Sequence, residues 1–171
     1  MSERSGNFAP VEDTLHGRYL TFYLNEECYG VEISYITDII QMQPIATLPD
    51  VSRYIKGIIN LRGEIIPVMD VRLRFGKSEA EYTERTCIIV ARTASLCVGL
   101  IVDGVSEVLF IADENISPLP KINGASNRYI KSIGKVGQEV KLLLDFEEMV
   151  SDDLDAIGHA SLPYLETASN A

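Results

Sequence analysis

Three aspartates, Asp70, Asp103 and Asp145, are the residues whose type and placement could support chemistry, because each ends an apolar, strand-like run. If these strand ends converge in a barrel, the carboxylates could bind a metal ion or divide acid and base roles. A simpler interpretation places Asp103 in an Asp-Gly turn and Asp145 at a helix N-cap. Asp70 would then be a turn residue or an ion-pair partner of Arg72 or Arg74. We favour this interpretation and predict no catalytic residue and no metal site.

The remaining residues with chemical potential are poorly placed for catalysis. His16 and His159 fall in or beside polar terminal stretches, where a general base would not be positioned. The motifs GxSxG, GxxxxGK[ST], GxGxxG and HExxH do not occur. Cys28, Cys87 and Cys97 lie in apolar runs without metal-binding spacing, which indicates free thiols in a reducing compartment. The sequence therefore predicts a protein that is not an enzyme and needs no cofactor.

Charge and hydropathy narrow the class of partner. The 171-residue chain carries a formal net charge of -10 and its basic residues are scattered, which argues against binding nucleic acid or an anionic membrane surface. No apolar stretch approaches the roughly 20 residues needed to cross a bilayer, and the first residues lack a signal-peptide core. We expect a soluble, cytoplasmic protein without direct membrane insertion.

Alternating apolar residues predict a chain built mainly of short strands. Leu20, Phe22 and Leu24, for example, share one face of an extended segment. The predicted strands cover residues 19–24, 28–33, 57–61, 65–69, 86–91, 96–102, 105–111, 129–133 and 139–144. Short strands at this close spacing are typical of barrels and sandwiches, and we favour two small barrels that share an interface.

Local signals predict how the strands are connected. Ser34 can cap a short helix that runs to Asp38. Arg62-Gly63-Glu64 is expected to form a turn between two strands, and Pro67 in the second of them predicts an edge position or a bulge, because proline donates no ladder hydrogen bond. Asp103-Gly104 is a type I′ hairpin signal.

The end of the chain predicts a helix that packs on the sheets. Asp145 followed by Glu148 fits a capping box, and the apolar face of the helix would contain Phe146, Met149, Val150, Leu154 and Ile157. The charged stretch 77–85 is a candidate connector between two halves. The predicted organisation is a flexible tail (1–16), a first barrel (17–83), a second barrel (84–150) with strands exchanged between the two, and a helix end with a tail (151–171).

One segment carries a family resemblance. Residues 57–75, GIINLRGEIIPVMDVRLRF, resemble the central signature of the CheW family of chemotaxis coupling proteins, although Val71 stands where leucine is commoner. The similarity extends to YGVEI at 29–33 and to VGLIVDGVSEV at 98–108. It covers about residues 17–150. The resemblance implies a mainly β fold of two intertwined, five-stranded SH3-like barrels, to which the sequence adds the short C-terminal helix.

The resemblance also implies a function. CheW proteins have no catalytic activity and act as cytoplasmic adaptors. They bind the regulatory domain of the histidine kinase CheA and the cytoplasmic tips of methyl-accepting chemotaxis receptors, which would recruit this chain to the inner face of the membrane. In receptor arrays the adaptor and the kinase domain alternate around rings.

The resemblance assigns residues to two docking faces. Kinase binding is assigned to Ile33, Ile36, Asp38 and Gly57, and receptor binding to Arg62, Cys87, Val98, Gly99, Val105 and Val108. Ile36 near Asp38 would give an apolar patch with a charged rim, as protein interfaces have. Gly63 would let Arg62 project toward a partner carboxylate or toward Asp38. Much of the apolar area in both sets could equally belong to the core.

Two other interpretations remain open. A small β-barrel that binds a ligand or catalyses a reaction could use Asp70 and its neighbours around an internal cavity; a ligand that raised the thermal stability would favour it. A CheW-like adaptor could also serve a chemosensory pathway other than flagellar chemotaxis, such as twitching or development.

Overall fold

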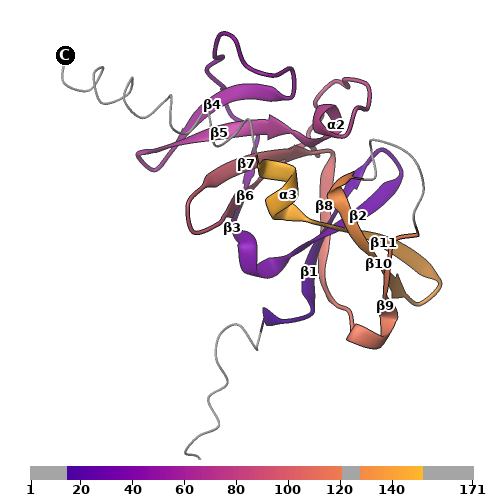
Figure 1. Ribbon diagram of the computed structural model, residues 1–171. Helices are drawn as coiled ribbons and strands as arrows, with labels where there is room; N and C mark the ends of the chain where they lie inside the picture. Colours follow the sequence, from indigo (N-terminus) through magenta and orange to yellow (C-terminus); the bar gives the residue numbers. More distant parts are fainter. Residues whose placement is uncertain (1–14, 121–127, 152–171) are drawn as a thin grey trace, which may run out of the picture.

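The computed structural model describes residues 15–120 and 128–151, which form mainly β structure (Figure 1). The strands are β1 (Arg18–Leu24), β2 (Glu27–Glu32), β3 (Ile36–Gln41), β4 (Ile55–Leu61), β5 (Glu64–Asp70), β6 (Cys87–Arg92), β7 (Cys97–Val102), β8 (Gly104–Phe110), β9 (Ile116–Pro118), β10 (Ile130–Val136) and β11 (Glu139–Leu144). The helical segments are η1 (Ile33–Tyr35), α2 (Val71–Arg74), η2 (Asp113–Asn115) and α3 (Phe146–Val150). None of the helices in this part of the chain is both long and apolar enough to cross a membrane.

The strands form two sheets. Sheet A has six strands in the order β8-β1-β2-β11-β10-β9, and sheet B has five in the order β3-β6-β7-β5-β4. Neighbouring strands are antiparallel, except that β2 with β11 and β5 with β7 are parallel. Each sheet takes strands from both sides of the boundary predicted between residues 83 and 84, so neither sheet corresponds to one half of the sequence. The division of the chain into subdomains at that boundary stays a prediction.

The described residues form three apolar clusters, one of which joins the two sheets. The largest lies between the sheets and joins Phe22 and Tyr29 of sheet A to Ile89 and Leu100 of sheet B. A second cluster, around Ile66, is confined to strands of sheet B. A third contains Tyr19, Ile111 and Leu143 and belongs to sheet A. Burial of apolar surface is the main favourable term in folding, so the shared cluster ties the two sheets into one body.

The short helix α3 completes the cluster between the sheets. Phe146, Met149 and Val150 are buried in it, and Figure 1 shows α3 where the two sheets meet. The predicted cap is confirmed, because the Glu148 amide donates a hydrogen bond of 3.0 Å to Asp145 Oδ1. Leu154 and Ile157, which were predicted for the same helix face, lie outside the described residues, as does His159.

The helix predicted from Ser34 to Asp38 is wrong. A single 3₁₀ turn covers Ile33–Tyr35 without a side-chain cap, and the chain then enters β3. Burial alternates along β3, and the strand pairs with β6, so its β-branched residues pack as they do in sheets. Ile36 and Asp38 therefore lie on a strand and not on a helix.

The prediction of a type I′ hairpin at Asp103-Gly104 is also wrong. β7 already pairs with β6 on one side and β5 on the other, so β8 leaves sheet B and pairs with β1 of sheet A. Gly104 has no positive φ, which a type I′ turn would require. The dipeptide is a crossover between the sheets.

Pro67 lies in β5, which is an interior strand of sheet B and not an edge. Its partner on β4 is Ile58, whose amide and carbonyl both bond Ala46, so this pair exchanges no ladder hydrogen bond. On the other side, the pairing of β5 with β7 begins only at Val68. Proline is tolerated here because both ladders leave its nitrogen without a bond to make. A register shift of β4 between Ile55 and Gly57 is adjacent, so the predicted irregularity is present.

Candidate docking site

The residues predicted to bind a kinase cluster around β3 and β4. Ile33 and Ile36 are half-buried against the cluster between the sheets. Gly57 is buried, and a Cβ added to it would lie 2.0 Å from the carbonyl oxygen of Ala46. Gly57 therefore permits a close backbone approach and presents no side chain to a partner. Ile39, which is not among the residues predicted to bind a partner, is 48% exposed on β3, an edge strand of sheet B.

Arg62 forms a bidentate ion pair with Asp38. Its Nη2 lies 3.0 Å from Oδ1 and its Nη1 lies 3.3 Å from Oδ2. Arg62 and Gly63, with φ of 51° and 88°, form the two-residue turn between β4 and β5, and this backbone aims the guanidinium at β3. The hydrogen bond from Arg62, followed by the charges of Arg62 and Arg92, holds the pKa of Asp38 below its usual value. The sequence predicted that Arg62 projects toward a partner carboxylate or toward Asp38, and in the structure it binds Asp38.

A second ion pair extends the first. Arg92 Nη2 on β6 lies 2.8 Å from Glu64 Oε1 on β5. The field of Arg92 also acts on Asp38. We call Asp38, Arg62, Glu64 and Arg92 the charged quartet. Its members come from opposite edges and from the middle of sheet B, so only the folded sheet brings them together; sequence spacing carried no signal for Glu64 or Arg92.

The residues predicted to bind a receptor do not lie together. Cys87, Val98 and Gly99 belong to sheet B, whereas Val105 and Val108 belong to β8 of sheet A. Cys87 is half-buried. The structure corrects the assignment of two others: Val98 has no exposed surface, and a Cβ on the buried Gly99 would meet Ile88 Cγ2 at 2.8 Å. Neither can contact a partner directly, because the apolar run in which they lie is the core strand β7.

β8 presents an apolar surface at the edge of sheet A. Val108 is 49% exposed and Phe110 is 61% exposed, while Val105 is half-buried against the shared cluster. The guanidinium carbon of Arg18 lies 5.9 Å from the centroid of the Phe110 ring. We call Val105, Val108 and Phe110 the β8 face. Phe110 was missed in the sequence because it follows the resembling segment.

Asp70, the principal candidate for chemistry, has a structural role. It is buried, its Oδ1 accepts the Leu73 amide as the N-cap of α2 at 3.3 Å, and Tyr82 donates its hydroxyl to Oδ2 at 2.8 Å. Burial and the bond to Asp70 raise the pKa of Tyr82. The suggested ion pairs with Arg72 and Arg74 are absent from the described salt bridges. In the described part of the chain, no group of three histidine, cysteine, aspartate or glutamate residues could hold a metal.

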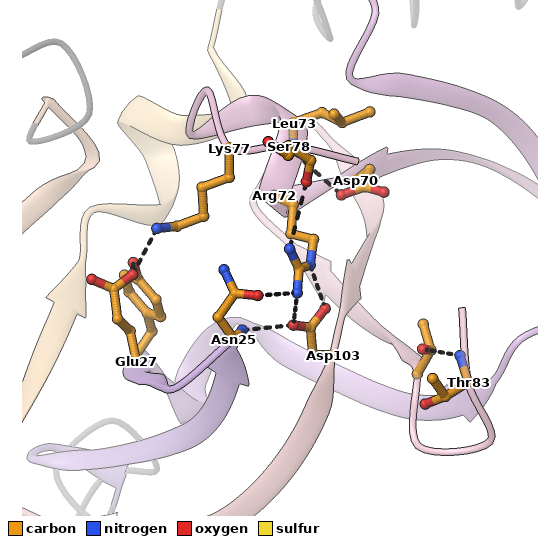
Figure 2. A network of polar contacts seen from close by, with 11 residues as sticks. Asn25, Glu27, Asp70, Arg72, Leu73, Lys77, Ser78, Thr83 and Asp103 are labelled. Atoms are coloured by element: carbon orange, nitrogen blue, oxygen red, sulfur yellow. Dashed lines mark hydrogen bonds and ion pairs between the residues drawn. The ribbon is translucent and has the colours of Figure 1, made fainter. Parts of the chain in front are cut away.

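Asp103 is bound within a polar network (Figure 2). Arg72 donates from Nε to Oδ1 at 2.8 Å and from Nη2 to Oδ2 at 2.6 Å. The Asn25 amide donates to Oδ2 at 2.6 Å, and Arg72 also contacts the Asn25 side-chain oxygen. The Asp103 carboxylate therefore links its own segment to those of Arg72 and Asn25. Its role is this connection and not the turn role predicted for it.

Acidification should reveal the contribution of Asp103 to stability. Burial raises the pKa of this carboxyl, but the hydrogen bonds from Arg72 and Asn25 and the charge of Arg72 outweigh it and leave the pKa below 3.8. A carboxyl with a depressed folded-state pKa stabilises fully above its unfolded pKa, and this stabilisation is lost as the pH falls through the folded pKa. We expect the urea midpoint to fall more steeply for the wild type than for Asp103→Asn between about pH 5 and pH 2. Equal slopes would contradict this role of Asp103.

The fold and these surfaces define a class of protein. Two sheets are packed on one shared core, and each carries exposed side chains: the charged quartet with Ile39 on sheet B, the β8 face on sheet A. Apolar residues beside charges are what protein-binding surfaces present, so this is a docking module with two faces. A family model described as a CheW-like domain matches residues 18–154, and the chain belongs to the CheW family of chemotaxis adaptor proteins.

Individual relatives agree with this assignment. The chain is 32% identical over 142 residues to "Chemotaxis protein CheW" of Klebsiella aerogenes, covering 82% of this chain and 86% of that protein. It is 32% identical over 139 residues to the CheW of Treponema pallidum, with coverage of 77% and 81%. Protein FrzA of Myxococcus xanthus is 25% identical over 134 residues, with coverage of 77% and 84%.

A solved structure shows the same fold. The scaffolding protein TtCheW from Thermoanaerobacter tengcongensis superposes with a TM-score of 0.75 at 30% identity, covering 80% of this chain and 94% of that chain. The predicted fold class, two SH3-like barrels in a mainly β protein, is confirmed. The described sheet A has one strand more than predicted, because the short β9 adds to it.

Proposed function

We propose that this chain couples methyl-accepting chemotaxis receptors to a CheA-type histidine kinase, and that each partner occupies its own face. The observation that carries the proposal is the separation of the two exposed surfaces onto different sheets, which share one apolar core. An adaptor needs two surfaces that can be occupied at the same time. A single shared surface would make the partners compete.

The kinase regulatory domain is assigned to the edge strand β3. Ile39 offers exposed apolar area, Ile36 extends it toward the core, and Asp38 with its partner Arg62 supplies the charged rim. Gly57 contributes by letting the chain after β3 lie against β4, which shapes this face. Ile33 supports it from the preceding turn.

The receptor tip, a helical hairpin, is assigned to the β8 face. An amphipathic helix binds by laying its apolar side against an apolar surface, and Val105, Val108 and Phe110 provide one. Cys87 of sheet B and Val105 both pack against the shared cluster, so Cys87 would support this surface indirectly. Arg62, assigned to receptor binding by the resemblance, pairs with Asp38 on sheet B, so in this proposal it belongs to the kinase face.

The mechanism is linkage between binding sites, with no bond made or broken. An adaptor changes kinase activity only if it binds the active and inactive arrangements with different affinities. A coupling of about 1–3 kcal/mol per site is typical and suffices when many units act together. Ring assembly with kinase domains would supply that multiplicity and hold contacts that are individually weak. The receptor tips place the adaptor in the cytoplasm at the inner face of the membrane.

Reconstitution tests the proposal. The purified chain is mixed with the regulatory domain of a CheA-type kinase and with a receptor cytoplasmic fragment, separately and together, and binding and kinase autophosphorylation are measured. We expect binary binding to each, a ternary complex, and kinase control by the receptor only when the chain is present. Mutually exclusive binding, or no binding to either partner, would refute it. Recovery from cells of a kinase belonging to another chemosensory pathway would favour the alternative adaptor role.

A further inference from the structure

The segment formed by α2 and the turn after it, residues 71–77, lies at the junction of the two sheets. The chain reaches it directly from β5 of sheet B, where Asp70 caps its first turn. Yet three of its side chains, Arg72, Arg74 and Lys77, bond to residues of sheet A or to the connections into and out of it. We call residues 71–77 the α2 clip. Val71 and Phe75 of the clip are buried in the shared apolar cluster, and its polar side chains make the contacts described next.

Arg72 makes the most extensive of these contacts (Figure 2). It is 12% exposed and donates twice to Asp103, the crossover residue between β7 and β8. It also reaches Asn25, in the turn between β1 and β2 of sheet A. The Asp103 amide in turn donates to the carbonyl oxygen of Tyr23 at 3.0 Å. One guanidinium thus connects the end of β5, the crossover and the first hairpin of sheet A.

Lys77 adds a parallel connection from the other end of the clip. Its Nζ lies 2.7 Å from Glu27 Oε1, at the start of β2, so two cations of the clip pair with the same hairpin (Figure 2). Glu27 also accepts a hydrogen bond from the hydroxyl of Tyr29, a residue of the shared cluster. The bond from Lys77 and then that from Tyr29 lower the pKa of Glu27.

Arg74 connects the clip to the end of the described chain. Its Nε donates to the carbonyl oxygen of Met149 in α3 at 2.9 Å. Its guanidinium carbon lies 4.4 Å from the ring centroid of Tyr54 and 4.7 Å from that of Tyr129, which precede strands of sheets B and A respectively. Phe75 stacks on the Tyr129 ring, with centroids 5.7 Å apart.

We propose that the α2 clip sets the angle between the two sheets, and with it the relative placement of the two docking faces, and that Arg72 is the positioning residue. Apolar packing is not directional, so the shared cluster by itself permits the sheets to rotate against each other. Bidentate bonds from a planar guanidinium are directional and hold one geometry. The part of this proposal that concerns the docking faces rests on the proposed function.

A distance measurement tests the angle directly. Ketone-reactive spin labels on unnatural amino acids at Lys135 of sheet A and Gln41 of sheet B, both exposed, leave the native cysteines untouched. We expect one narrow distance distribution in the wild type and a broader, shifted one in Arg72→Met. Asp103→Asn, which keeps the shape and removes the charge, should behave in the same way. The matched control is Lys131→Met, which breaks a 2.7 Å ion pair with Glu32 inside sheet A and should leave the distribution unchanged.

The functional consequence is measured on the same variants. In Arg72→Met and Asp103→Asn we expect each partner to bind separately within about twofold of the wild type, while receptor control of the kinase falls at least about tenfold. Unchanged distance distributions in both variants would overturn the proposal. Altered distances with wild-type kinase control would overturn its link to function. If the wild type bound neither partner, the proposed function would fail, and the distances would still decide the role of the clip.

Discussion

Gly57→Ala is expected to cost at least about 3 kcal/mol of stability, whereas Gly63→Ala, the matched control, should cost about 1 kcal/mol. Both glycines have a positive φ, 145° and 88°, so both substitutions strain the backbone. Only at Gly57 would the new Cβ meet an obstacle, the Ala46 carbonyl oxygen at 2.0 Å; nothing lies within 4 Å at Gly63. A backbone atom cannot move aside as the end of a side chain can.

The obstacle matters because it lies at the closure of sheet B. The amide of Ala46 donates to Ile58 at 2.9 Å and the amide of Ile58 donates to Ala46 at 2.8 Å. Relieving the clash would break this bridge and separate the segment after β3 from β4. Urea unfolding monitored by far-ultraviolet circular dichroism measures both free energies. If the two variants lost the same amount of stability, the close approach at Gly57 would not be the constraint described.

This result also decides how a loss of kinase binding at Gly57 is interpreted. A substitution that lowers binding because it unfolds sheet B should lower both the urea midpoint and the affinity for the kinase. A contact residue would lose binding at an unchanged midpoint. We expect the first pattern, since Gly57 is buried and has no side chain to present.

Arg62→Glu should lower receptor-dependent kinase activation at least about tenfold while leaving the urea midpoint unchanged. Arg62 is 69% exposed at a turn, so it contributes little to the core, yet it is the more exposed partner in the ion pair with Asp38. The substitution places two carboxylates side by side where β3 meets the turn of β4 and β5, and their repulsion disturbs the proposed kinase face.

Charge reversal separates the two roles available to Arg62. Asp38→Arg alone should be as damaging as Arg62→Glu, and the double variant should recover a large part of the activation, because it restores the internal attraction with opposite polarity. No recovery in the double variant would mean that Arg62 instead meets a carboxylate of the partner. A folded Arg62→Glu protein with wild-type activation would remove the charged quartet from the docking site altogether.

Local features were predictable because neighbouring residues determine them. The turn at Arg62-Gly63 was predicted from the glycine, which adopts a positive φ without steric cost, and it is present with both φ values positive. The cap at Asp145 needs only a carboxylate three residues before an amide, and it is present too. The free state of the three cysteines in the structure also agrees with their apolar surroundings in the sequence.

Features that depend on which strands become neighbours were mispredicted. Asp103-Gly104 has the composition of a hairpin, but β7 has partners on both sides, so the chain crosses to the other sheet. Ser34 resembles a helix cap, but β3 gains more by pairing with β6. Val98 matches a family position assigned to receptor contacts, but its strand is in the centre of sheet B and is buried.

The sequence by itself determined the family, the mainly β composition, the turn at Arg62-Gly63 and the cap at Asp145, because these follow from patterns within a few residues or from a nineteen-residue signature. Only the tertiary structure decided that Arg72 meets Asp103 and Asn25, that Asp38 meets Arg62, and that Val105 and Val108 lie on sheet A while Asp38 lies on sheet B. Those contacts join residues separated by 24 to 47 positions. Their partners are selected by strand order and by packing between sheets, which no local pattern of residues encodes.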